Sequence, residues 1–109
     1  MLIAFAEKNL RDICENESKA TSILGRKNAE KLMHRLADLR AANQVFDLII
    51  GNPHEISGPC PRDFSIDICT NISIILCSNH SLNPLLQDGC IDWSKVSRIK
   101  ILRIRNENS

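Results

Sequence analysis

Residues 64–77 read FSIDICTNISIILC, and apolar side chains recur at every second position in both halves of this stretch. The first half carries Phe64, Ile66 and Ile68 in alternation with small or polar residues, and the pattern resumes at Ile72 after a Thr-Asn pair. A period of two places the apolar residues on one face of a β-strand, and a short polar pair between two such runs is typical of a turn. The stretch therefore predicts a β-hairpin.

The chain before the hairpin predicts one strand and then helices. Residues 2–6 form a short apolar run that suits a first strand, and apolar residues then recur at helical spacing over residues 7–14 and 20–39, with a charged interruption at 16–19. Because Gly25 lowers helix propensity by roughly 1 kcal/mol, we expect a kink there or a helix that begins only after it. The helical stripe leaves these polar side chains facing water: Arg26, Lys27, Glu30, Lys31, Arg35, Asp38 and Arg40.

The connections around the hairpin are rich in turn-forming residues. Residues 44–50 have room for one more helical turn before Gly51-Asn52-Pro53 ends it, and residues 54–57 begin a strand. A Gly- and Pro-rich connection then follows at 58–61. Residues 79–92 are polar and contain a proline and a glycine, which predicts a loop before the last strand at 96–105.

The last strand has an unusual apolar phase. Ile99 and Ile101 share one face, whereas Leu102 and Ile104 share the other. This pattern indicates burial on both faces in the middle of a sheet, or a bulge between Ile101 and Leu102. One strand, two or three helices and at least three further strands predict an α+β fold with the helices packed on one face of the sheet.

Composition sets further limits. At 109 residues, with 43% apolar and 25% charged residues, the sequence predicts a single globular domain spanning 1–109. Five cysteines without a C-x-x-C pair favour reduced thiols over a disulfide framework or a zinc site. Since no stretch resembles a signal peptide or a membrane span, we expect a cytoplasmic protein. Aromatic residues are few, and Trp93 is expected to anchor packing rather than to stack on a base.

Positive charge is concentrated at the end of the chain, although the net charge is only +1. Residues 94–109 contain a single acid, Glu107, against five cations: Lys95, Arg98, Lys100, Arg103 and Arg105. Such a patch suits contact with RNA phosphates and could equally receive an acidic partner segment. A solvated strand edge guarded by cations is the alternative interpretation.

Four segments in order resemble those of the RelE/ParE superfamily of toxins, in the branch of the HigB-type plasmid-maintenance killer proteins. They are Ala29-x-x-Leu32-x-x-Arg35-Leu36-Ala37-Asp38-Leu39-Arg40-Ala41-Ala42, His54-Glu55-Ile56-Ser57-Gly58, Phe64-Ser65-Ile66-Asp67-Ile68 and Gly89-x-Ile91-Asp92-Trp93-Ser94-x-Val96. The resemblance implies a helical pair on a twisted, mainly antiparallel sheet, and growth inhibition through ribosome-dependent cleavage of mRNA without metal or cofactor. It also implies a small helix-turn-helix antitoxin encoded nearby.

Metal-independent RNA cleavage needs a base, an acid and cations for the charge that develops on phosphorus. The candidate catalytic residues are His54, Arg62, Asp67 and Arg103, and the candidate RNA-binding residues are Lys95, Arg98, Lys100 and Arg105. His54 matches a family segment, and its imidazole suits proton transfer, although it could instead fix the entry of its strand. Asp67 is interpreted either as an acid that positions nearby cations or as a partner in a structural salt bridge.

Two family features are missing from this chain. The resembling toxins carry an aromatic-Arg pair where this chain has Ile72-Ser73, and they often end in a Tyr or His, whereas this chain has no Tyr. A cation from an adjacent strand, from Arg62, Arg103 or Arg105, could replace the missing arginine. Three hypotheses follow: a ribosome-dependent endoribonuclease with a rearranged or weakened site, a non-cutting module that binds an antitoxin or the ribosome, and a ParE-like inhibitor of DNA gyrase.

Overall fold

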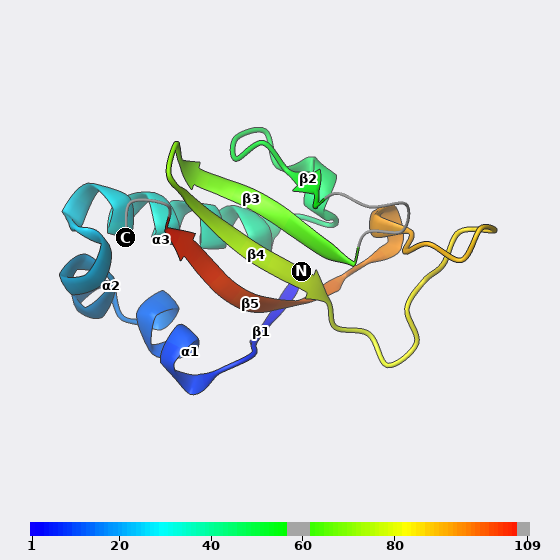
Figure 1. Cartoon of the computed structure of the whole chain (residues 1–109), viewed down its shortest axis with the longest axis horizontal. Helices are drawn as coiled ribbons and strands as arrows, with labels where there is room; N and C mark the ends of the chain where they lie inside the picture. The colour runs from blue at the N-terminus through cyan, green and yellow to red at the C-terminus, as the bar shows by residue number, and fades with distance from the viewer. Residues whose placement is uncertain (57–61, 107–109) are drawn as a thin grey trace.

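Five strands form one twisted sheet, with α3 behind it and the shorter helices at one end (Figure 1). The computed structural model describes residues 1–56 and 62–106, so the predicted connection at 58–61 and residues 107–109 lie outside it. The elements are β1 (Leu2–Phe5), α1 (Lys8–Glu15), α2 (Glu17–Leu24), α3 (Arg26–Ala41), β2 (His54–Glu55), β3 (Asp63–Cys69), β4 (Ile72–Ser78) and β5 (Arg98–Asn106). The predicted α+β fold is confirmed.

The sheet has the strand order β1-β5-β4-β3-β2, in which only the β1–β5 pair is parallel. β5 therefore lies between two strands, as its apolar phase suggested. The register passes from Leu76↔Ile101 to Ile75↔Arg103 and skips Leu102, which is the predicted bulge. The bulge explains the unusual phase, because it returns Ile104 to the face of Ile101 and places Arg103 on the same face as Lys100. The alternative of burial on both faces is wrong, since Arg103 and Arg105 are exposed.

Two short breaks separate the three helices. The charged interruption predicted at 16–19 is confined to Asn16, whose side chain accepts a hydrogen bond from the Lys19 amide at 3.2 Å and caps α2. At Gly25 the backbone has a φ of 87°, and α3 begins immediately after it, as predicted. None of the helices in residues 1–56 and 62–106 combines the length and the apolar character that crossing a membrane would require.

The core lies between α3 and the sheet. Leu32, Leu36 and Leu39 of α3 are fully buried, as is Phe64 of β3. The Phe64 ring centroid lies 4.9 Å from that of Trp93. Because Trp93 is only 3% exposed, it anchors packing as predicted and is not available to stack on a base.

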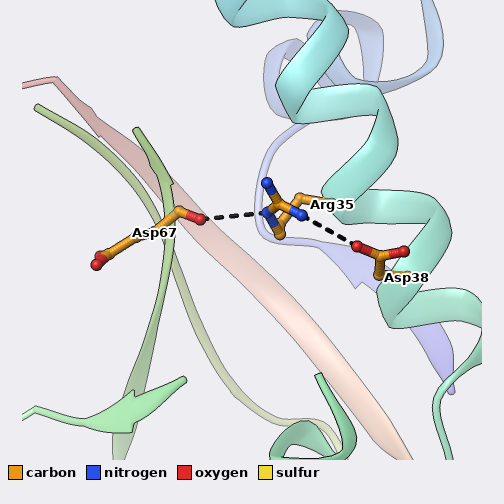
Figure 2. A network of polar contacts seen from close by, with 3 residues as sticks. All are labelled: Arg35, Asp38 and Asp67. Carbon is orange, nitrogen blue, oxygen red and sulfur yellow. Dashed lines mark hydrogen bonds and ion pairs between the residues drawn. The ribbon is translucent and has the colours of Figure 1, made fainter. Parts of the chain in front are cut away.

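One charged side chain of α3 is buried, contrary to the prediction that it faces water. Arg35 is only 8% exposed and reaches from the helix toward β3 (Figure 2). Its Nε donates to the backbone oxygen of Asp67 at 3.3 Å, and its Nη1 pairs with Asp38 at 3.1 Å. Arg35 lies at the margin of the apolar stripe, so the close packing of α3 on β3 decides its burial.

The prediction of reduced thiols throughout is wrong for Cys90, which is disulfide-bonded. Cys14, Cys69 and Cys77 are free, and Cys60 lies outside the described residues. The prediction failed because spacing along the chain says little about cysteines that folding brings together. Burial raises the pKa of the Cys14 thiol to about 11, so it stays protonated and behaves as a small apolar side chain.

Candidate nucleic-acid interface

The sheet face opposite α3 gathers most of the predicted site residues. Residues paired across neighbouring strands place their side chains on the same face. The registers form three rows across this surface, which we call the polar face: His54–Ser65–Ile75–Arg103, Asp67–Ser73–Arg105 and Asp63–Cys77–Lys100. Its centre is closed, because Ser65 and Ile75 are fully buried, and the Ser65 hydroxyl has no hydrogen-bond partner among the described residues.

Asp67 is held in place from several directions. Its Oδ1 accepts a hydrogen bond from the Ser73 hydroxyl at 3.2 Å, and its Oδ2 accepts one from the Asn52 side-chain amide at 3.3 Å. Its backbone amide donates to the Gly51 carbonyl at 2.6 Å. No ion pair in the described part of the chain includes Asp67, so the predicted salt bridge is not found there. Hydrogen bonds, not a cation, fix this carboxylate.

His54 is exposed and oriented by the backbone. Its Nδ1 lies 2.7 Å from the carbonyl oxygen of Asn52. Because a carbonyl oxygen only accepts hydrogen bonds, Nδ1 must carry the proton, and in the neutral ring Nε2 keeps its lone pair. The two interpretations of His54 are therefore compatible: the ring is tied to the loop at one nitrogen and can accept a proton at the other.

The turn at Gly51 and Asn52 joins these two groups, a role beyond the helix stop that its residue types predict. Gly51 has a φ of 110° and Asn52 a φ of 45°, both in the region that L-residues rarely adopt. A Cβ added at Gly51 would lie 3.0 Å from Arg35 Cδ and 3.0 Å from Ile66 Cγ2. Asn52 connects His54 to Asp67, so this turn sets the geometry of the site.

Gly51→Ala is expected to lower the free energy of unfolding by about 2–4 kcal/mol, combining backbone strain with overpacking. Gly25→Ala and Gly89→Ala are matched controls, because both glycines have positive φ but no atom within 4 Å of the added Cβ. The controls should lose about 1 kcal/mol from strain alone. Urea denaturation measures all three variants, and equal losses would contradict the tight packing around Gly51.

The cations of β5 are available to a ligand. Arg98, Lys100, Arg103 and Arg105 take part in no ion pair within the described residues. Arg103 and Arg105 are exposed, and Arg105 is the register partner of Ser73. A cation on the neighbouring strand therefore lies beside the position where the resembling toxins carry an arginine.

Two predicted residues lie away from this cluster. Lys95 is in a 3₁₀ turn outside the sheet, with its ammonium 4.0 Å from the Asp92 carboxylate. Arg62 precedes β3, at the end of the strand remote from Asp67, which corresponds to about 17 Å along an extended chain. The structure thus brings His54, Asp67 and Arg103 onto one face with Arg105, but not Arg62 or Lys95.

His54 and Arg103 lie at opposite ends of their row on the polar face. Three strand spacings separate the two residues in their row, or about 14 Å between backbones. Within residues 1–56 and 62–106, no group of three His, Cys, Asp or Glu side chains is placed to hold a metal ion.

Comparisons with known proteins bear on the fold. No protein-family model matches the sequence, and no curated protein matches it significantly. Among solved structures, a YoeB/ParE toxin from Agrobacterium tumefaciens is 11% identical, with a TM-score of 0.59 over 97% of this chain and 98% of its own. The YoeB dimer from Staphylococcus aureus is 14% identical, with a TM-score of 0.58 over 96% of this chain and 94% of its own.

A third similar structure is the YoeB–YefM complex from Staphylococcus aureus, at 15% identity and a TM-score of 0.57, over 96% of this chain and 95% of the other. At such low identity the likeness concerns the fold, and it extends over nearly the whole of each chain. The HigB-type branch within the superfamily stays a prediction. The chain has the RelE/ParE-type fold, as it is seen in the YoeB and ParE toxins.

Proposed function

We propose that this protein is the toxin of a type II toxin–antitoxin pair and that it cleaves mRNA on the ribosome. The observation that carries the proposal is the polar face, where an oriented histidine and a hydrogen-bonded aspartate share one sheet surface with arginines that form no ion pair in the described part of the chain. The likeness to YoeB and ParE toxins supports the toxin assignment. Phosphodiester cleavage requires a base and cations that are held in a fixed arrangement relative to each other.

In this proposal a ribose 2′-hydroxyl attacks the adjacent phosphorus, a 2′-oxygen–phosphorus bond forms, and the bond from phosphorus to the 5′ oxygen breaks. His54 Nε2 takes the proton of the 2′-hydroxyl, and the leaving 5′ oxygen takes a proton from water. Arg103 and Arg105 stabilise the negative charge that builds up on the phosphoryl oxygens. Asp67 acts indirectly, because its hydrogen bond with Asn52 holds the loop that orients His54.

The proposed partners are a ribosome carrying mRNA and a small helix-turn-helix antitoxin. The similarity to the YoeB–YefM complex supports the existence of a protein partner. We propose that the chain acts as a single domain in the cytoplasm, where translating ribosomes are found. A neighbouring reading frame for a small helix-turn-helix protein would agree with this assignment, because such antitoxins also bind operator DNA.

The test is controlled expression followed by mapping of new mRNA 5′ ends. Wild-type protein is expected to arrest growth and to produce ends within translated codons, and His54→Ala should reduce cleavage by about 10²-fold or more because it removes the base. His34→Ala is the matched control, since His34 is an exposed histidine on α3, in the helical layer. If wild-type protein leaves transcripts intact, or if both variants cut equally, the proposed mechanism is wrong.

A non-cutting binding module is the second candidate, and one observation favours it. Ser73 offers a hydroxyl, already bonded to Asp67, where the resembling toxins carry an arginine. Under this alternative, expressed protein binds ribosomes or an antitoxin without producing new mRNA ends. Inhibition of DNA gyrase, which is the ParE-like alternative, would instead appear in a supercoiling assay with purified gyrase.

A further inference from the structure

The loop between β4 and the 3₁₀ turn at Trp93–Lys95 has a folded structure of its own. Figure 1 shows it, in yellow and orange, beyond the end of the sheet where β4 ends and β3 begins. Leu85 and Ile91 form an isolated antiparallel bridge, and the Leu86 amide donates to the Cys90 carbonyl at 2.8 Å. Cys90 is also disulfide-bonded. These contacts give the loop a defined shape, so a cavity that it walls is preformed.

Two adjoining cavities lie between this loop and the sheet. Their volumes are about 250 and 460 Å³, and ligand pockets typically measure roughly 300–1,000 Å³. The two cavities share three lining residues, so we treat them as one site, which we call the loop pocket. Its lining includes Arg62, Asp63, Leu82, Asn83, Leu85 and Ile91.

The polar groups of the loop pocket are available to a ligand. Arg62 and Asp63 take part in no ion pair within residues 1–56 and 62–106. The Ser78 hydroxyl donates to Asn83 Oδ1 at 2.8 Å, which orients the amide and leaves its NH₂ group as a donor. The pocket therefore presents a carboxylate, a guanidinium and an oriented amide.

Opposite charges in one cavity disfavour ions and favour a neutral polar ligand. A cation would be repelled by Arg62 and an anion by Asp63, whereas a neutral group with donors and acceptors can bond to both. Guanine is such a group, because N1–H and N2–H donate side by side while O6 and N7 both accept. No other RNA base combines these two pairs. Leu82 and Leu85 are 90% and 58% exposed and offer apolar surface to a flat ring.

We propose that the loop pocket binds a guanine base, with Asp63 accepting from N1–H and N2–H and with Arg62 or Asn83 donating to O6 and N7. The base belongs either to a free guanine nucleotide or to an RNA strand on the polar face. The second source is within reach because Asp63 lies on that face, in one row with Cys77 and Lys100. Only the assignment of the base to mRNA rests on the proposed function; the binding of guanine does not.

The test is isothermal titration calorimetry with purified protein and nucleoside 5′-monophosphates, in the absence of ribosomes. Guanosine monophosphate is expected to bind more tightly than the adenosine, cytidine and uridine monophosphates by about tenfold or more. Inosine monophosphate is the matched control, because it differs from guanosine monophosphate only in lacking the 2-amino group. It should bind about tenfold more weakly, since it loses one hydrogen bond to a carboxylate.

Two variants that each replace a carboxylate by an amide locate the site. Asp63→Asn should weaken binding of guanosine monophosphate by about tenfold or more and abolish its advantage over inosine monophosphate. This ratio of affinities is insensitive to the lost charge, because both ligands carry the same phosphate. Glu55→Gln is the control, since Glu55 is exposed and pairs with Phe64 on the other sheet face. It should keep both the affinity and the preference, and circular dichroism checks that both variants fold.

Hexamers of 2′-O-methyl RNA with one central guanine or inosine distinguish the two sources of the base. Tighter binding of the guanine hexamer than of guanosine monophosphate assigns the pocket to an RNA strand, and the reverse order assigns it to a free nucleotide. The proposal is wrong if inosine and guanosine monophosphates bind equally to wild-type protein, or if Asp63→Asn and Glu55→Gln behave alike. Since these titrations involve no cleavage, failure of guanine binding is distinguishable from failure of the proposed function.

Discussion

Replacing both Arg103 and Arg105 by alanine is expected to lower the rate of ribosome-dependent mRNA cleavage by about 10²–10³-fold. The two side chains are exposed on the polar face as the register partners of Ile75 and Ser73, and neither takes part in an ion pair within the described residues. Removal of a group that stabilises charge in the transition state has an effect of this size, because its charge-assisted hydrogen bonds strengthen as charge develops. The measurement is cleavage of a defined mRNA on purified ribosomes.

Lys27→Ala/Lys31→Ala is the matched control for this prediction. It removes the same positive charge from exposed positions on α3, in the layer opposite the polar face. The control should cleave at the wild-type rate, and both double variants should retain the wild-type free energy of unfolding within about 0.5 kcal/mol per substitution. If the control loses as much activity as Arg103→Ala/Arg105→Ala, net charge and not the polar face determines cleavage.

Phe64→Ala is expected to lower the free energy of unfolding by about 3–5 kcal/mol, a large share of the roughly 5–15 kcal/mol typical of a domain. Phe64 is fully buried between the sheet and α3, and its ring contacts Phe46 and Trp93 at centroid distances of 5.3 and 4.9 Å. Truncation removes these contacts and leaves a cavity that the surrounding side chains fill only in part. Urea denaturation followed by circular dichroism measures the change.

Phe46→Ala tests whether burial accounts for that loss. Phe46 belongs to the same aromatic cluster but is 52% exposed, so its truncation should cost about 1 kcal/mol and leave no closed cavity. A loss for Phe64→Ala no greater than that for Phe46→Ala would show that the core repacks around residue 64. The role of Phe64 as the centre of the aromatic cluster would then be wrong.

The sheet face on which several site residues lie could be predicted from the sequence pattern within single strands. Alternation along residues 64–68 places Asp67 opposite the apolar face, and the predicted bulge at Leu102 returns Arg103 and Arg105 to the side of Lys100. These inferences succeed because side-chain direction in a strand follows from its period of two. Lys95 was proposed from the concentration of charge near the end of the chain and Arg62 from its place next to a strand, and neither criterion gives the direction of a side chain.

The partners of those residues could not be anticipated in the same way. Asn52 and Ser73 bond the two oxygens of Asp67 from a turn and from a different strand, at separations of 15 and 6 residues. From the sequence, Asn52 was interpreted only as part of the segment that ends a helix. Ser73 was noted only as the position where the resembling toxins carry an arginine. The Gly51-Asn52 pair could have indicated the turn that holds Asp67 and His54, because glycine and asparagine both tolerate positive φ and are typical of specific turns.

The sequence by itself determined the order and type of the elements, the helix break at Gly25 and the hairpin, because periodicity and backbone preferences act over a few neighbouring residues. For β5 it left a bulge and burial on both faces as alternatives, and the register with β4 decided for the bulge. Only the tertiary structure decided the parallel pairing of β1 with β5, the burial of Arg35 and the disulfide at Cys90. The β1–β5 pairing and the contact of Arg35 with β3 each join segments far apart in the chain. The free energy of such a long-range contact depends on which surfaces meet during folding. Local sequence patterns do not encode which surfaces these are.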